Sequence, residues 1–154
     1  MSVIRAILAV IAAYITIGLI IFGGFTLFYM VIGTDGAYQP GSYAVSTTWI
    51  LGTIPVSIAA ALAGGWVCRK IAKGRKAVIA LVAVIALLGA AEFVVQLGRA
   101  SDPIPERTGD VPVFKAASES RQPVWLAGLN VLIGIVGAGV GGRALKSSES
   151  EPAS

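Results

Sequence analysis

The sequence predicts an all-α membrane protein built as a bundle of four transmembrane helices. Of its 154 residues, 56% are apolar and only 13% are charged, which is too little polar surface to keep a domain of this size in solution. The apolar residues also fall into four long runs with few charges. Each run can cross a bilayer core, which takes about 20 helical residues.

The four predicted spans cover residues 6–32, 43–68, 77–98 and 122–142. The first span would be roughly 40 Å long as a helix, so we expect it to tilt or to project past a core of about 30 Å. It is too long to be the apolar region of a secretory signal peptide, the alternative interpretation of a run that follows Arg5. In the second span, Ser42 is expected to cap the start and Pro55 to kink the helix without breaking it. Together the spans form one domain, residues 1–146.

Lysine and arginine residues predict the orientation of this bundle. One side carries eight of the twelve basic residues, namely Arg5, Arg69, Lys70, Lys73, Arg75, Lys76, Arg143 and Lys146. Because basic flanks remain in the cytoplasm, we expect both termini and the link at residues 69–76 to be cytoplasmic. The loops at residues 33–42 and 99–121 are then outside. The basic link either only fixes this topology or also binds anionic lipid or a partner.

Two segments outside the spans have a predicted structure. In the outer loop at residues 99–121, Asp110 is expected to cap a short helix over residues 111–120, with Pro112 in its first turn. The cytoplasmic tail at residues 147–154 is polar and short, and we expect it to be disordered.

An internal duplication is suggested by two ladders of polar and small residues. The ladders have a spacing of four and a constant offset of 77, and they are Thr53, Ser57, Ala61 and Gly65, then Asn130, Gly134, Ala138 and Gly142. Residues four apart share a helix face, and small residues allow close helix packing in lipid. The ladders indicate either ordinary packing or two parallel two-helix repeats, with the second and fourth spans meeting at their axis.

Glu92 is the only acidic residue inside a predicted span, and it defines a candidate polar site. Gln96 and Arg99 share its helix face, while Thr53 and Asn130 are expected at a similar depth on other helices. An unpaired charged group in the membrane costs at least a few kcal/mol. Glu92 is therefore expected to be neutralised or to find donors among these residues. It is either a functional group or part of a structural hydrogen-bond network, or it reaches to the nearby interface.

Catalytic chemistry has little support. The chain has one cysteine, Cys68, and no histidine, which removes cysteine-based metal sites and the commonest general base. It also lacks a P-loop and a Gly-x-Ser-x-Gly motif. We therefore expect no enzyme activity, no cofactor and no metal. The net charge of +4 is explained by the cytoplasmic flanks, so no nucleic-acid partner is expected.

Three segments, at residues 33–43, 107–112 and 121–125, resemble those of small uncharacterised bacterial proteins with four spans. The resemblance implies a bacterial inner membrane and carries no activity. Small multidrug exporters are also short four-span proteins with a membrane glutamate, but their acid lies in the first helix and Glu92 lies in the third.

We expect a non-enzymatic accessory or interaction module that packs against itself or a larger membrane partner. The alternative is a small transporter or channel subunit that uses Glu92 as a coupling group. An acid in a cleft that water can reach favours the alternative, whereas a dry, fully paired acid favours the first.

Overall fold

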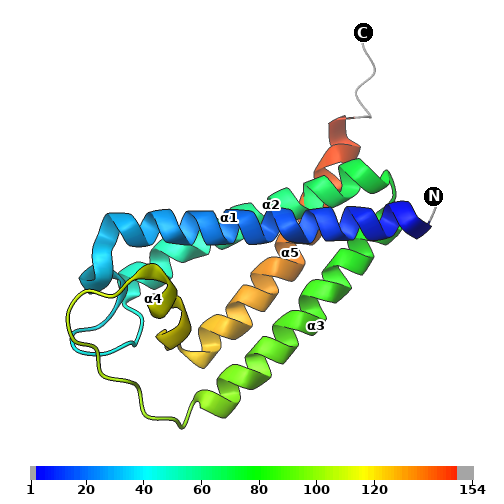
Figure 1. Cartoon of the computed structure of the whole chain (residues 1–154). Coiled ribbons are helices and arrows are strands. Elements are labelled where there is room, and N and C mark those ends of the chain that lie inside the picture. The colour runs from blue at the N-terminus through cyan, green and yellow to red at the C-terminus, as the bar shows by residue number, and fades with distance from the viewer. Residues whose placement is uncertain (1–2, 149–154) are drawn as a thin grey trace.

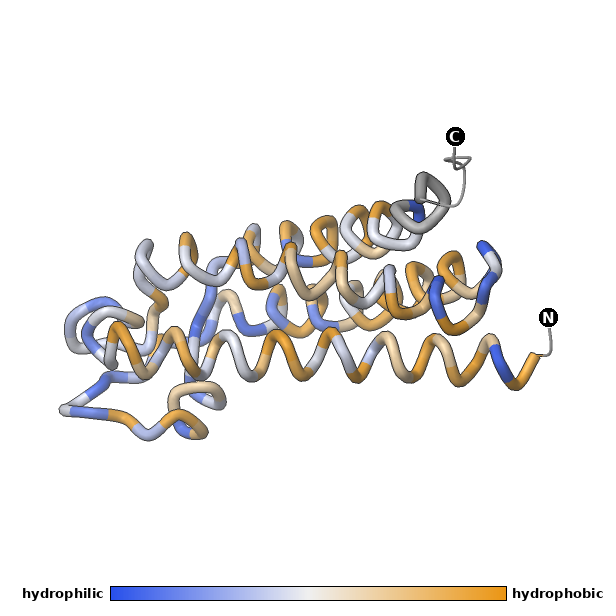
Figure 2. The backbone as a smooth tube through the Cα atoms, turned by 90° about the horizontal axis from the view of Figure 1, so that it is seen from above, coloured by the Kyte–Doolittle hydropathy of each residue, from blue (hydrophilic) through white to orange (hydrophobic). Residues whose placement is uncertain are grey.

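The computed structural model describes residues 3–148, which form five helices (Figure 1). They are α1 (Val3–Ala37), α2 (Thr47–Ala72), α3 (Arg75–Arg99), α4 (Val113–Glu119) and α5 (Val124–Ser148). All except α4 include a stretch long and apolar enough to cross a membrane, which gives four candidate spans. The predicted all-α, four-helix bundle is confirmed, and the protein is a multi-pass membrane protein. Hydrophilic residues gather toward the ends of the bundle (Figure 2).

The helices are packed unevenly around α2. Helices α1 and α5 make the most extensive contacts with α2, whereas α3 packs mainly on α5. The buried residues of α3 are Ala77, Val78 and Leu81, all in its first two turns. Figure 1 shows the consequence: α1 and α3 lie close together near the N-terminus and diverge toward the opposite end. We call the end with the α2–α3 turn the turn end, and the end with residues 38–46 and 100–123 the loop end.

The turn end is closed by small side chains in direct contact. Ala9, Ala13, Cys68, Leu81 and Ala138 are fully buried there. A Cβ atom added at Gly65 would overlap the carbonyl of Ala138, so the backbones of α2 and α5 touch at this point. In lipid, where no hydrophobic effect drives helices together, this close approach supplies the packing energy.

The end of α1 and the start of α2 differ from the prediction. At Gly33, where the first predicted span ends, φ is 69°, a value that suits glycine, and one further turn continues to Ala37.

Helix α2 begins at Thr47 and not at residue 43, because the preceding residues pair with other loops: Val45 N–H donates to the carbonyl of Arg121 at 3.0 Å. The expected cap at Ser42 is wrong. Ser46 is the cap, and its hydroxyl accepts from Trp49 N–H at 3.0 Å.

Pro55 lies inside α2, which continues across it. The short outer helix α4 is present, but it begins after Pro112 and has no side-chain cap, so the expected cap by Asp110 is wrong. Residues 147 and 148 of the predicted tail belong to α5, and residues 149–154 lie outside the described residues.

Candidate functional site: a cleft between α1 and α3

The divergence of α1 from α3 leaves a cleft in the loop-end half of the bundle. Two cavities of ≈ 550 and ≈ 380 Å³ adjoin each other there and share Gly18, Ile21 and Phe25 of α1, Glu92 of α3 and Gln122 before α5. Cavities of this size lie within the range of small-ligand pockets. The cleft therefore lies between α1 and α3, and residues of α2 and α5 line its deeper part.

The larger cavity is the deeper one. It reaches Tyr14 of α1, Ser57 of α2 and Asn130 of α5. The smaller cavity extends toward the loop end, where Val113 and Ala116 of α4 line it. Figure 1 shows α4 at the loop end, where α1 and α3 are apart.

Glu92 is the chemically most distinctive group in the cleft. Its side chain is exposed, and its Oε1 accepts a hydrogen bond of 2.8 Å from Gln96 Nε2, one turn further along α3. Asn130 lines the deeper cavity together with Glu92, but among the described residues the hydrogen-bond partner of Glu92 is Gln96. The carboxyl group therefore keeps hydrogen-bonding capacity that faces the cleft.

The structure brings together part of the predicted polar site. Glu92, Gln96 and Asn130 line the cleft, whereas Thr53 and Arg99 do not. Thr53 is buried within α2 and donates to the carbonyl of Trp49 at 2.9 Å. Arg99 is exposed at the end of α3. Sequence reasoning missed Gln122, whose position directly before Pro123 at the start of a span could have indicated a polar group at the cleft entrance.

The two predicted ladders face different neighbours. Ser57 and Ala61 are buried on α2, and Gly65 faces Ala138 of α5. Gly134 and Gly142 face α3 instead, because an added Cβ would lie 2.8 Å from a methyl of Ile85 and 2.6 Å from a methyl of Val78, respectively. The second and fourth spans do make extensive contact, as an axis between repeats requires, and the duplication itself stays a prediction.

A network of polar contacts at the loop end ties α1 to the chain before α4. The buried Arg107 pairs with Asp35 at 2.8 Å and donates to the carbonyl of Gly109 at 3.0 Å. The Tyr29 hydroxyl donates to the carbonyl of Val111 at 2.6 Å. These contacts join the end of α1 to the segment before α4, so they fix how far apart α1 and α4 stand.

Helix α4 has its own anchor in this network. The Tyr38 hydroxyl donates to the carbonyl of Ala116 at 2.7 Å. Burial raises the pKa of the Tyr38 phenol, although a hydrogen bond with Ser120 acts in the opposite direction. The phenol therefore remains a donor at neutral pH and keeps α4 over the cleft.

The cleft offers hydrogen-bonding groups on a largely apolar lining. Within residues 3–148, no three histidine, cysteine, aspartate or glutamate side chains are grouped to hold a metal ion. The two cavities do not extend to the fully buried residues of the turn end, which are Ala9, Leu81 and Ala138. The arrangement can bind a molecule that offers hydrogen-bond donors and an apolar surface. No protein family model, curated protein or solved structure matches this chain.

Proposed function

We propose that this protein is a non-enzymatic interaction module of the bacterial inner membrane. In this proposal its cleft holds a transmembrane helix of a larger membrane partner. Both termini are cytoplasmic, because the turn end carries the excess of basic residues. The observation that carries the proposal is the exposed carboxyl group of Glu92 in a cleft that opens between two membrane helices.

Glu92 favours a protein occupant over acyl chains. A polar group at membrane depth is stabilised by donors, and lipid tails offer none. Gln96 supplies one hydrogen bond, which leaves acceptor sites on the carboxyl group. A helix with a polar side chain can fill those sites and cover the apolar lining with the same surface.

The packing of α3 supports the same proposal. Beyond Leu81, no residue of α3 is buried, whereas α2 has buried residues along its whole length. The outer two thirds of α3 pack against α5, where Gly89 faces Val131, but this packing leaves none of their residues buried. A partner helix at this position would give α3 the packing that α2 already has.

A small transporter with Glu92 as its coupling group is the second candidate. It is favoured by the size and depth of the cavity that Glu92 lines. The close contact of α2 with α5 at the turn end supports the interaction module, because a channel needs a path between the helices through both halves of the bundle. A transporter would have to open the contact between α2 and α5 at Gly65 and Ala138, where backbones touch.

Photo-crosslinking in cells tests the proposal. A photo-reactive amino acid at Leu88, which lines the deeper cavity, should form an adduct with another membrane protein. The same group at Leu132, which is 60% exposed on α5 and lines neither cavity, is the matched control and should form few protein adducts. Adducts of Leu88 with lipid alone, adducts with a second copy of this chain alone, or equal protein adducts at both positions would contradict the proposal.

A further inference from the structure

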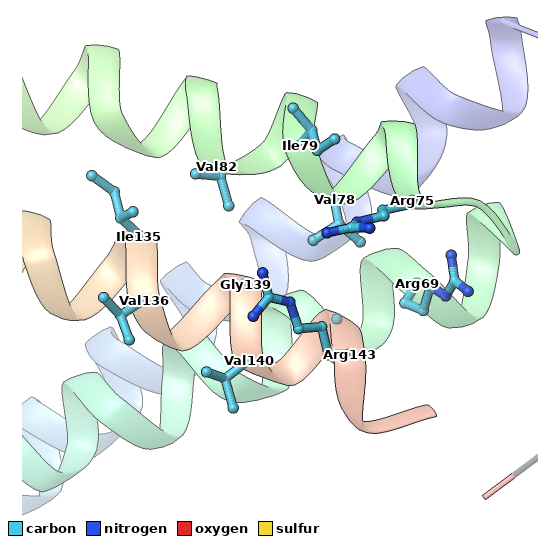
Figure 3. Close-up of a pocket in the computed structure, with 11 residues that line it drawn as sticks. Arg69, Arg75, Val78, Ile79, Val82, Ile135, Val136, Gly139, Val140 and Arg143 are labelled. Atoms are coloured by element: carbon cyan, nitrogen blue, oxygen red, sulfur yellow. The ribbon is translucent and has the colours of Figure 1, made fainter. Parts of the chain in front are cut away.

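A separate cavity of ≈ 990 Å³ lies at the turn end, between α3 and α5 (Figure 3). Its lining is of two kinds. Three arginines come from three helices: Arg69 from α2, Arg75 from α3 and Arg143 from α5. The remaining lining is apolar and comes from both walls of the groove, and it consists of Val78, Ile79, Val82, Ile135, Val136, Gly139, Gly142 and Val140.

The three arginines form a strongly positive site. Within residues 3–148, none of these three guanidinium groups forms an ion pair with a carboxylate, whereas Arg107 pairs with Asp35 at the loop end. Figure 3 shows Arg75 and Arg143 extending over the groove from its opposite walls. A guanidinium group has a planar fork of donors that matches the oxygens of a phosphate, and it gives charge-assisted hydrogen bonds.

The apolar groove continues from the arginines toward the middle of the membrane. Ile135 lies eight positions before Arg143, which is roughly 12 Å along a helix, and one leaflet of the hydrocarbon core is about 15 Å thick. Ile79 and Val136 are 60% and 61% exposed on its walls. The groove therefore has about the length of an acyl chain that starts from a headgroup held by the arginines.

Gly139 shows that the groove is open space and not part of the helix packing. A Cβ atom added there would meet nothing within 4 Å, whereas one at Gly142 would crowd Val78. The absence of a side chain at Gly139 thus leaves room for a bound molecule. It is not required for the close packing of α3 against α5.

We propose that this site binds one anionic phospholipid. Arg75 and Arg143 hold the phosphate, Arg69 adds positive charge beside them, and one acyl chain lies in the groove over Gly139. This goes beyond the general attraction of basic flanks to anionic membranes, which depends on all nearby charges. Lys70, Lys73 and Lys76 carry equal charge on the same turn and do not line the site; Lys70 instead stacks on Trp66, 4.4 Å from the ring centre.

Native mass spectrometry of the full chain in detergent tests this site. We expect one molecule of palmitoyl-oleoyl phosphatidylglycerol to bind at least about tenfold more tightly than phosphatidylcholine with the same chains, since charge-assisted hydrogen bonds are the stronger kind. Changing the three arginines to glutamine should remove this preference. Changing Lys70, Lys73 and Lys76 to glutamine removes the same charge and should leave the preference intact. Inorganic phosphate, which has no chain, should not displace the bound lipid.

Two single variants keep the test decisive if the triple arginine variant does not fold. Arg143→Gln should weaken phosphatidylglycerol binding. Gly139→Leu, which fills the groove, should weaken binding with all three arginines in place, whereas Gly23→Leu, which also enters open space but lies on α1, should not. Equal losses in the arginine and lysine triples, equal binding of both lipids, or full binding by Gly139→Leu would overturn the proposal.

Discussion

At the scale of single residues, the structure contains one prominent charge pair that the sequence alone does not reveal. Arg107 is 8% exposed and its partner Asp35 lies 72 positions earlier in the chain. Local patterns identify both as loop residues, but which loop residues meet depends on how the helices pack. By contrast, the three cleft residues Glu92, Gln96 and Asn130 could be predicted, because helix periodicity and depth in the membrane place them.

Arg107→Ala should lower the melting temperature in detergent. The substitution removes a charge-assisted hydrogen bond to Asp35 and a second one to Gly109, and we expect a loss of about 1–3 kcal/mol in the free energy of unfolding. Asp35 is largely exposed, so it stays hydrated and adds little to the loss. Arg99→Ala, at the exposed end of α3, is the control. If the two variants melt alike, the network at the loop end contributes no stability.

Glu92 variants distinguish the two candidate functions. Glu92→Gln keeps a group that accepts and donates hydrogen bonds, so an interaction module should keep its partner, and Glu92→Leu should lose it. A transporter coupled through the carboxyl group should lose activity in both variants, because an amide does not ionise. Recovery of the partner after purification in mild detergent is the measurement, and loss of the partner in the glutamine variant would count against the interaction module.

At the scale of helices, hydrophobic runs predicted the four spans well and their ends less well. Helix α2 begins at Thr47 and not at the predicted residue 43, because Tyr43 and Val45 are buried in contacts with distant loops. The divergence of α3 from α1 was not predictable. A helix that faces lipid and a helix that faces protein are both apolar, so composition does not say which face is covered.

The glycines of the helices should divide into two classes. Gly65→Leu should destabilise the protein by at least about 2 kcal/mol, because the side chain would force the backbones of α2 and α5 apart. Gly139→Leu meets open space and should leave the melting temperature within about 3 °C of wild type, a shift of less than about 1 kcal/mol. Melting in detergent, followed by circular dichroism, compares them. A Gly65→Leu variant as stable as Gly139→Leu would contradict the close contact of α2 with α5.

At the scale of the whole molecule, the two ends of the bundle are packed differently. At the turn end, small residues bring the helices into direct contact beside the groove between α3 and α5. At the loop end, α1 and α3 diverge and the loops are joined by hydrogen bonds. This asymmetry is what confines the cleft to one half of the membrane. In the proposed orientation, the cleft lies in the outer half.

Cysteine labelling tests that orientation. In a Cys68→Ser background, single cysteines at Asp102 and Ser118, both exposed at the loop end, should react with a reagent that does not cross the membrane. A cysteine at Lys73, exposed at the turn end, should react only after the cells are opened. Labelling of position 73 in intact cells would reverse the orientation.

The central claim is that the cleft between α1 and α3 is occupied by a helix of another protein. The most direct test combines the photo-reactive group at Leu88 with a substitution that fills the cleft. Gly18 lines both cavities, and a Cβ atom added at Gly18 or at Gly23 meets nothing within 4 Å. We predict that Gly18→Leu abolishes the protein adduct at Leu88 while Gly23→Leu retains it. If the adduct persists unchanged in a folded Gly18→Leu variant, the partner does not bind in the cleft.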